Sequence, residues 1–238
     1  MIFEICVDSV SGVRAAKDAG AHRVELCADL LEGGTTPSRG MIRQARTVAG
    51  IKLNVIIRPR GGDFLFDDDE FAIMRADIET AKAEGADGTI DLTRTRELIA
   101  LARPLSVTFH RAFDMTPDPL AALETLISLG VDRVLTSGQE PSVLEGLPLI
   151  VELVGRAGDR IIVMPGGSVT AHNVERIVSA AKPRELHFAA LATAGSGMRF
   201  RREHVFMGGE LRPPEYDRPT TSGSIISSVM AKAGHRNH

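Results

Sequence analysis

The sequence has little of what marks secreted, membrane or nucleic-acid-binding proteins. Two cysteines in 238 residues cannot form a disulfide framework. Lys and Arg number 28 against 31 Asp and Glu, a net charge of −3, so no basic excess predicts a nucleic-acid or anionic-membrane partner. No apolar run approaches the roughly 18 residues that span a bilayer, and the first residues do not resemble a secretory signal. We therefore expect a cytoplasmic protein that binds neither nucleic acid nor membrane.

What the sequence does contain is a regular alternation of two patterns. Short β-rich runs predict strands at 2–7, 22–27, 51–58, 104–110, 132–136, 160–164 and 185–189. Between them, apolar residues at helical spacing predict helices at 10–19, 39–48, 69–84, 91–102, 119–129, 143–156 and 171–182. Strand–helix alternation of this kind indicates an α/β fold with a parallel sheet, and its repetition favours a closed TIM-type (β/α)8 barrel. An open doubly wound sheet is the alternative.

One interval in this repeat is about twice as long as the others. Leu53 and Val107, in consecutive expected strands, are 54 residues apart, whereas the other steps are 22 to 29 residues. This interval holds two helical patterns with only Gly85–Ile90 (GADGTI) between them. We therefore predict a barrel that lacks about one strand near residues 85–90. Such a barrel either closes with seven strands or leaves two neighbours with unpaired backbone groups.

The composition changes near the end of the chain. After Ala194 the sequence becomes polar and rich in Gly and Pro, and a short amphipathic pattern follows at 224–233. We therefore predict a barrel over residues 1–195 and a C-terminal extension over 196–238. The extension would contain a short closing helix and end in a disordered tail.

Alternation along the strands predicts a polar barrel interior. In each expected strand the apolar residues share one face, which we assign to packing against the helices. The opposite, inward-facing set is then Glu4, Cys6, Glu25, Cys27, Asn54, Arg58, Thr108 and His110. Buried charges need partners, and we expect Glu4, Glu25, Arg58 and His110 to supply them for one another.

The two cysteines occupy equivalent ends of adjacent expected strands. Neighbouring strands lie about 5 Å apart, so the sulfurs of Cys6 and Cys27 are expected within reach of one ion. Soft thiolates favour Cu(I), whereas zinc wants four ligands and no tetrahedral Cys/His set is evident beyond these two residues and His110. Inert packing and a redox disulfide are the alternatives.

Two glycine-containing segments are candidates for binding an anion. Arg58 and Arg60 follow the third expected strand, and guanidinium groups suit carboxylate or phosphate. Gly166 and Gly167 follow the strand at 160–164, where barrels often hold phosphate on backbone N–H groups. The alternative is that the arginines pair with acidic groups of the interior and the glycines only shape loops.

A third motif joins titratable groups at one strand end. His110, Arg111 and Asp114 lie together after the strand at 104–110, an assortment that suits general acid–base work. Glu25 and Arg58 complete the candidate catalytic set. A structural ion pair beside a hydrogen-bonded histidine is the alternative.

Together these segments resemble a known family. The motifs are EICVDSV, RVELCADLLEGGTTPSRG, VIIRPRGGDF, TFHRAFDM, LGVDRVLTSG and IVMPGGSVT, and the chain from about residue 2 to 190 resembles the CutC copper-homeostasis family. The resemblance implies a TIM-type barrel, a cytoplasmic homo-oligomer and Cu(I) binding by Cys6 and Cys27. It also implies a pocket of Glu, Arg and His like that of an enzyme without an assigned reaction.

The chain departs from the family pattern at two places. After Gly88 it lacks about ten residues that resemble a strand and loop in relatives, which agrees with the long interval above. The family's H-x-S-A-R motif is replaced by His187–Leu191 (HFAAL), which removes a Ser and an Arg. Our leading hypothesis is Cu(I) binding at the barrel mouth. The alternatives are an enzyme for a small anionic or phosphorylated metabolite, and a degenerate variant with little function.

Overall fold

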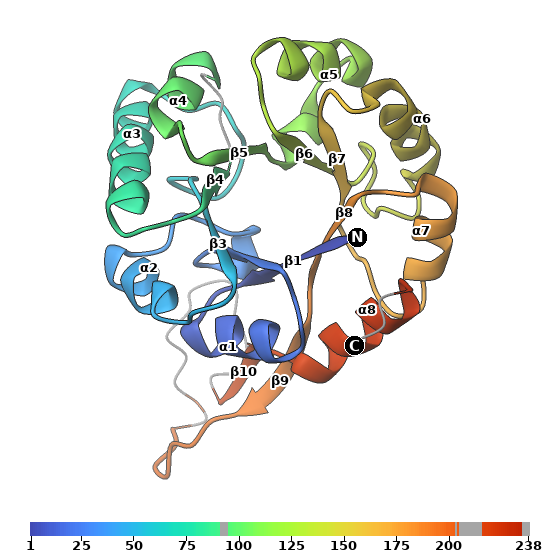
Figure 1. Cartoon of the computed structure of the whole chain (residues 1–238). Helices are drawn as coiled ribbons and strands as arrows, with labels where there is room; N and C mark the ends of the chain where they lie inside the picture. Colours follow the sequence, from blue (N-terminus) through green and yellow to red (C-terminus); the bar gives the residue numbers. More distant parts are fainter. Residues whose placement is uncertain (91–94, 203, 205–215, 235–238) are drawn as a thin grey trace.

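The computed structural model describes residues 1–90, 95–202, 204 and 216–234, and it shows a ring of parallel strands surrounded by helices (Figure 1). The strands are β1 (Ile2–Val7), β2 (Arg23–Leu26), β3 (Lys52–Ile56), β4 (Gly88–Ile90), β5 (Ser106–Phe109), β6 (Arg133–Thr136), β7 (Ile162–Pro165) and β8 (Glu185–Ala189). The helices between them are α1 (Val10–Asp18), α2 (Arg39–Arg46), α3 (Asp68–Ala83), α4 (Thr95–Ala102), α5 (Pro119–Ser128), α6 (Leu147–Ala157) and α7 (Val174–Ala181). Two 3-10 helices, η1 (Leu30–Glu32) and η2 (Arg111–Met115), follow β2 and β5. The predicted TIM-type α/β architecture is confirmed.

The sheet follows the chain order around the ring. Its order is β7-β6-β5-β4-β3-β2-β1-β8, and all neighbouring strands run parallel. β7 and β8 are the two ends of this order, and no ladder joins them among the described residues. The ring is therefore a partial barrel, and β1 lies at the centre of a continuous β8–β1–β2 ladder.

The interval predicted to lack a strand contains a very short one. β4 has only three residues, yet it pairs with β3 on one side and β5 on the other. A Cβ atom on Gly88 would lie 2.8 Å from the backbone oxygen of Ser106, so glycine lets β4 fit between its neighbours. The sequence therefore shortens this strand rather than removing it. The helix expected at 91–102 begins at Thr95, and residues 91–94 lie outside the described part of the chain.

Aspartates at the Gly-Ala/Val-Asp steps tie neighbouring strands together at their starts. Asp87 Oδ2 accepts the backbone N–H of Leu53 at 2.8 Å, and Asp132 Oδ2 accepts that of Val107 at 2.7 Å. Each carboxylate thus satisfies a donor that the parallel ladder leaves unpaired. These contacts fix the amino-terminal end of the ring and leave the carboxyl ends of the strands for a site.

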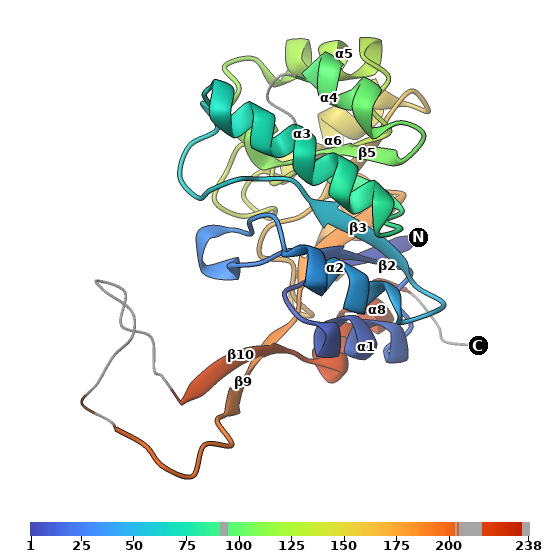
Figure 2. The same ribbon diagram turned by 90° about the vertical axis from the view of Figure 1, so that its left-hand side faces the viewer.

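The chain after β8 leaves the ring before it returns. β9 (Leu191–Gly195) and β10 (Asp217–Thr221) pair antiparallel and form an arm that projects from the barrel (Figure 2). The arm begins before residue 196, where we placed the boundary. α8 (Gly223–Lys232) then packs near α1 and α7, close to the helix we placed at 224–233. No described helix is both long and apolar enough to cross a bilayer, and the predicted tail at 235–238 lies outside the described residues.

Candidate functional site

A cluster of buried charges fills the barrel near the amino-terminal ends of the strands. Glu4 on β1 binds Arg23 on β2 and accepts a hydrogen bond from Asn54 Nδ2 at 3.0 Å. Arg23 also binds Glu185 on β8, whose carboxylate lies 3.1 Å from the Arg133 Nε atom. All five side chains are buried. Because each charge faces an opposite one, the interior can be polar without isolated ions.

Two of the pairings expected from the sequence differ from those observed. Glu4 pairs with Arg23 rather than with Arg58. Arg23 lies two residues before Glu25 on the inward face of β2, directly opposite Glu4 in the β1–β2 ladder. Glu25 does meet His110, as expected. The Arg58 guanidinium instead donates to main-chain oxygens of the surrounding loops, those of Glu32, Gly34 and Gly62.

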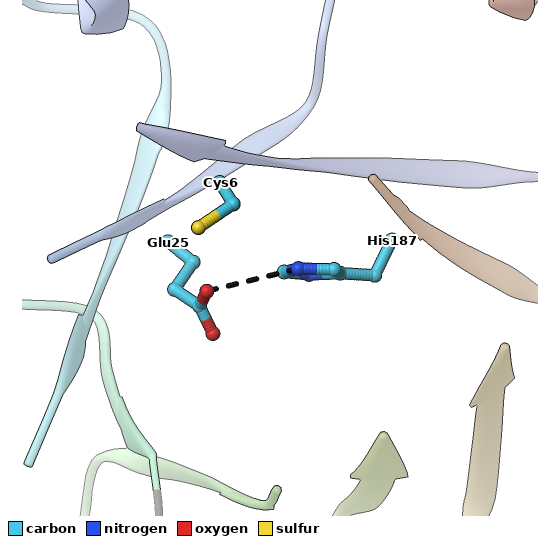
Figure 3. Close-up of side chains that lie close together, drawn as sticks. All are labelled: Cys6, Glu25 and His187. Atoms are coloured by element: carbon cyan, nitrogen blue, oxygen red, sulfur yellow. Dashed lines mark ion pairs between the residues drawn. The ribbon is translucent and has the colours of Figure 1, made fainter. Parts of the chain in front are cut away.

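Two residues after Glu185 on β8, His187 lies between two carboxylates. Its Nδ1 atom is 2.9 Å from Glu4 Oε1, and its Nε2 atom is 3.7 Å from Glu25 Oε2 (Figure 3). Burial alone would lower the pKa of His187, but the charge of Glu25 and the hydrogen bond with Glu4 outweigh it and raise that pKa. The two acids therefore favour the protonated form of the imidazole.

Glu25 carries a buried atom that lacks a hydrogen-bond partner. Its Oε1 atom lies 3.0 Å from His110 Nε2, within ion-pair distance, but neither atom has a hydrogen-bond partner among the described residues. Burial would raise the pKa of Glu25, yet the charges of His110 and His187 outweigh it and lower that pKa. Glu25 is only 2% exposed. An ionised carboxylate with an unused acceptor is thus present beneath the mouth.

The two thiols converge beside this carboxylate. The sulfur atoms of Cys6 and Cys27 lie 3.7 Å apart, and Cys27 Sγ also approaches the main-chain oxygen of Val7 at 3.4 Å. Both residues are buried in a small apolar cluster with Ile56, against which Leu30 packs. The hydrogen bond with Cys27, burial and the nearby charge of Glu25 together raise the pKa of the Cys6 thiol. The Cys6 thiol is therefore protonated at neutral pH.

The geometry of the thiol pair suits a shared metal ion. Two sulfurs bound about 2.3 Å from one ion lie about 3.8 Å apart at a tetrahedral angle, close to the separation observed, and about 4.6 Å apart in linear two-coordination, which a small outward movement of the thiols would reach. Gly34 gives space at this point, because a Cβ atom there would lie 3.6 Å from Cys27 Sγ. Cys6, Glu25 and His187 also offer donor atoms that all lie within 4.8 Å of one another. In Figure 3 the Cys6 sulfur points toward the Glu25 carboxylate.

Arg60 does not contribute a free guanidinium to an anion site. Its Nε atom donates to Glu70 at 2.5 Å, and its terminal nitrogens donate to Gly61, Asp63 and Leu65. Every nitrogen of the group is thus engaged, by its own loop or by Glu70 in the first turn of α3. Anion binding by Arg60, as predicted, would require some of these contacts to open.

The Gly166–Gly167 turn lies against the histidine and arginine of the mouth. A Cβ atom on Gly166 would lie 2.6 Å from Leu135 and 3.2 Å from His187, and Gly167 adopts a φ of 111°. A Cβ atom on Gly167 would lie 3.7 Å from the guanidinium carbon of Arg111. Both glycines therefore permit a close approach of backbone to the site, as their place after β7 suggests.

Asp114 acts as an anchor for this end of the barrel. It accepts hydrogen bonds from Thr136 and from the backbone N–H of Ser137 and Gln139, and it binds Arg111 Nε at 2.8 Å. Its side chain is 6% exposed. These contacts hold Asp114 in place beside Arg111, and a catalytic role for Asp114 stays a prediction.

A pocket of about 250 Å³ opens at the carboxyl end of the strands. It is lined by Glu32, Gly33, Arg58, Gly62, Phe64, His110, Arg111, Asp114 and Met115. Several of these belong to the loops after β2, β3 and β5, as expected for a barrel mouth. The predicted residues Arg58, His110 and Asp114 all line this pocket. Glu25 does not line it but lies within ion-pair distance of His110.

Four buried polar residues of the interior were not among the predicted site residues: Arg23, Arg133, Glu185 and His187. The signal was present in the sequence. The same alternation that placed Glu25 inward also places Arg23 inward, and it gives Glu185 and His187 a common face on β8. Applying the alternation to every strand would have identified them.

Comparison with known proteins agrees with this architecture. The CutC family model matches residues 1–192. The chain belongs to the CutC family. The CutC proteins most similar to it include the mouse "Copper homeostasis protein cutC homolog", which is 48% identical over 98% of this chain and 89% of that protein. A CutC protein of Mesorhizobium japonicum is 46% identical over 98% of this chain and 94% of that protein.

Solved structures place the same CutC fold among other barrels. The putative copper homeostasis protein CutC from Streptococcus agalactiae superposes with a TM-score of 0.73 at 34% identity, covering 79% of this chain and 98% of that one. N-(5'-phosphoribosyl)anthranilate isomerase from Pyrococcus furiosus gives a TM-score of 0.59 at 14% identity, with 98% of both chains covered. The second likeness shows the barrel fold alone.

Proposed function

We propose that this CutC family member serves copper homeostasis by binding Cu(I) between Cys6 and Cys27. The observation that carries the proposal is the 3.7 Å approach of the two sulfurs from neighbouring strands. Relatives named copper homeostasis proteins support the same role. Copper is here a cargo that the protein takes up and gives away.

The chemistry of the donors favours Cu(I) over a divalent ion. Thiolates are soft ligands and select Cu(I), and two of them satisfy its low coordination number. Of the harder donors nearby, His187 is held between Glu4 and Glu25. The apolar contacts of Ile56 and Leu30 shield the sulfurs from water.

Binding at this site replaces thiol protons. The raised pKa of Cys6 means that the ion must displace its proton, so binding releases protons and strengthens with rising pH. The proposal includes a cytoplasmic location, because free thiols persist in a reducing compartment. The family resemblance adds a homo-oligomer, which light scattering of the purified protein tests.

Copper titration under reducing conditions tests the proposal. Wild-type protein should compete with a chromogenic Cu(I) chelator, and X-ray absorption should show sulfur around copper. Cys6→Ser, Cys27→Ser and the double variant should lose the competition. Met164→Leu is the matched control. It removes a different buried sulfur, one that contacts Arg23, and it nearly conserves the side-chain volume, so the fold should tolerate it. A folded double variant that binds copper with unchanged stoichiometry would rule the site out.

A second candidate function is proton transfer on a small ligand at the mouth. The observation that favours it is the buried Glu25 Oε1 atom facing His110 Nε2, each without a hydrogen-bond partner. Such a pair at the carboxyl end of barrel strands suits general acid–base work. Thermal-shift screening of metabolites should then find a stabilising ligand whose effect is lost in His110→Gln and kept in the double cysteine variant.

A further inference from the structure

The mouth pocket contains a buried positive charge that no carboxylate neutralises. Arg58 is 7% exposed, and its terminal nitrogens bind only main-chain oxygens. No acidic side chain lies within ion-pair distance of it in the part of the chain that the structure describes. Its Nε atom is buried without a hydrogen-bond partner. A buried guanidinium with an unpaired N–H donor costs folding free energy unless an anion lies near it.

A second guanidinium faces the same pocket in a fixed orientation. Arg111 Nε binds Asp114 at 2.8 Å, and Nη2 donates to Ser137 Oγ at 2.7 Å. Its Nη1 atom has no recorded partner within the described residues. Because Asp114 and Ser137 already hold the Nε and Nη2 atoms, a ligand that binds Nη1 does not incur the usual entropic cost of ordering an arginine side chain.

Backbone donors lie beside this arginine. The N–H groups of residues 167–169 make no hydrogen bond within the described ranges, although Val169 is buried. Gly167 lies against the Arg111 guanidinium, and Ser168 has a φ of 60°. Successive N–H groups in such a turn form a concavity that binds anions, and barrels commonly hold them after the seventh strand.

We propose that the mouth binds a small oxyanion, a phosphate or carboxylate group of a metabolite, between Arg58 and Arg111. The pocket of about 250 Å³ accommodates only a small molecule. Glu32 is the acidic side chain at this rim that pairs with neither arginine, and it is exposed, where water screens its charge. The inference goes beyond copper binding and does not depend on the thiols, and it names the ligand class for the second candidate function.

Calorimetric titration with inorganic phosphate tests this inference, in copper-free reducing buffer at constant ionic strength. Arg111→Gln should weaken phosphate binding on the order of tenfold or more, because it removes a charge-assisted hydrogen bond. Arg111→Lys keeps the charge without the fork and should bind with intermediate affinity. Arg156→Gln is the control, since it removes a comparable exposed pair, that with Glu152, far from the mouth.

A parallel titration with malonate distinguishes the two kinds of oxyanion. Binding of phosphate alone identifies a phosphate site, and binding of both identifies a general oxyanion site. Absence of binding to either, or equal binding by wild type and both Arg111 variants, would overturn the inference. The Cys6→Ser/Cys27→Ser variant should keep phosphate binding, so failure here and failure of the copper proposal are separate results.

Discussion

The buried Glu4 carboxylate makes the fold sensitive to a change of one atom type. Glu4→Gln keeps the size of the side chain but removes the charge that faces Arg23 and His187. The carboxylate has no exposure, and burial would raise the pKa of Glu4, but the hydrogen bond with His187 and the charge of Arg23 hold that pKa far below its usual range. Glu4 is therefore ionised at neutral pH, and its loss leaves two buried cations undercompensated.

The expected loss of stability follows from that geometry. Removing one partner of a buried ion pair typically costs about 3–5 kcal/mol. For a domain of this length each kcal/mol shifts the melting temperature by about 2–4 °C, so Glu4→Gln should lower it by roughly 6–20 °C. Asn54, which donates to the same carboxylate at 3.0 Å, can rotate its amide and recover only a neutral hydrogen bond.

Urea unfolding at pH 7, followed by circular dichroism in reducing, metal-free buffer, measures the effect. Glu124→Gln is the matched control, because Glu124 forms a bidentate pair with Arg160 at 2.7 and 2.8 Å on the surface. An exposed pair contributes about 0–1 kcal/mol. If Glu4→Gln unfolds within about 1 kcal/mol of the wild type, the charge cluster does not stabilise the barrel as argued.

Two further predictions concern His187 and the β7 turn. Because the pKa of His187 is raised, the stabilisation from its protonated form is complete below about pH 6.5 and is lost as pH rises through that raised pKa. The free energies of unfolding of the wild type and His187→Gln, measured between pH 6 and 9, should therefore converge at the alkaline end. A difference between them that does not change with pH would contradict this. Gly166→Ala would place a methyl group 2.6 Å from Leu135 and should cost about 1–3 kcal/mol. Gly155→Ala, inside α6 with nothing within 4 Å, should instead stabilise by about 0.5–1 kcal/mol, and thermal melts that show the same sign for both would refute the contrast.

The fold was predictable because every strand except β4 is a short β-rich run between helical patterns. Helix and strand positions agree to within a few residues, for example β1 at Ile2–Val7 and α5 at Pro119–Ser128. β4 was missed because three residues, one of them Gly88, carry no periodicity that can be read. Pairing by β3 and β5, a tertiary effect, makes that segment a strand.

The site was predictable where strand alternation decides it and unpredictable where loops do. Alternation brought Cys6, Cys27 and Glu25 together correctly, since neighbouring parallel strands align their inward faces. The partners of Arg58 and Arg60 could not be read in this way. Their guanidinium groups bind carbonyl oxygens whose positions depend on the path of the loops after β2 and β3.

The shortest ladders of the sheet lie on the side away from the thiols, since β5 and β6 share two residue pairs and β4 shares three with each of its neighbours. In the sheet order, β3 and β2 separate β4 from β1, while the ladders β8–β1 and β1–β2 span four or five residue pairs each. Local opening of the native sheet should therefore involve the ladders from β4 to β6, where few hydrogen bonds must break. The β8–β1–β2 corner that holds both sulfurs can stay paired during such openings.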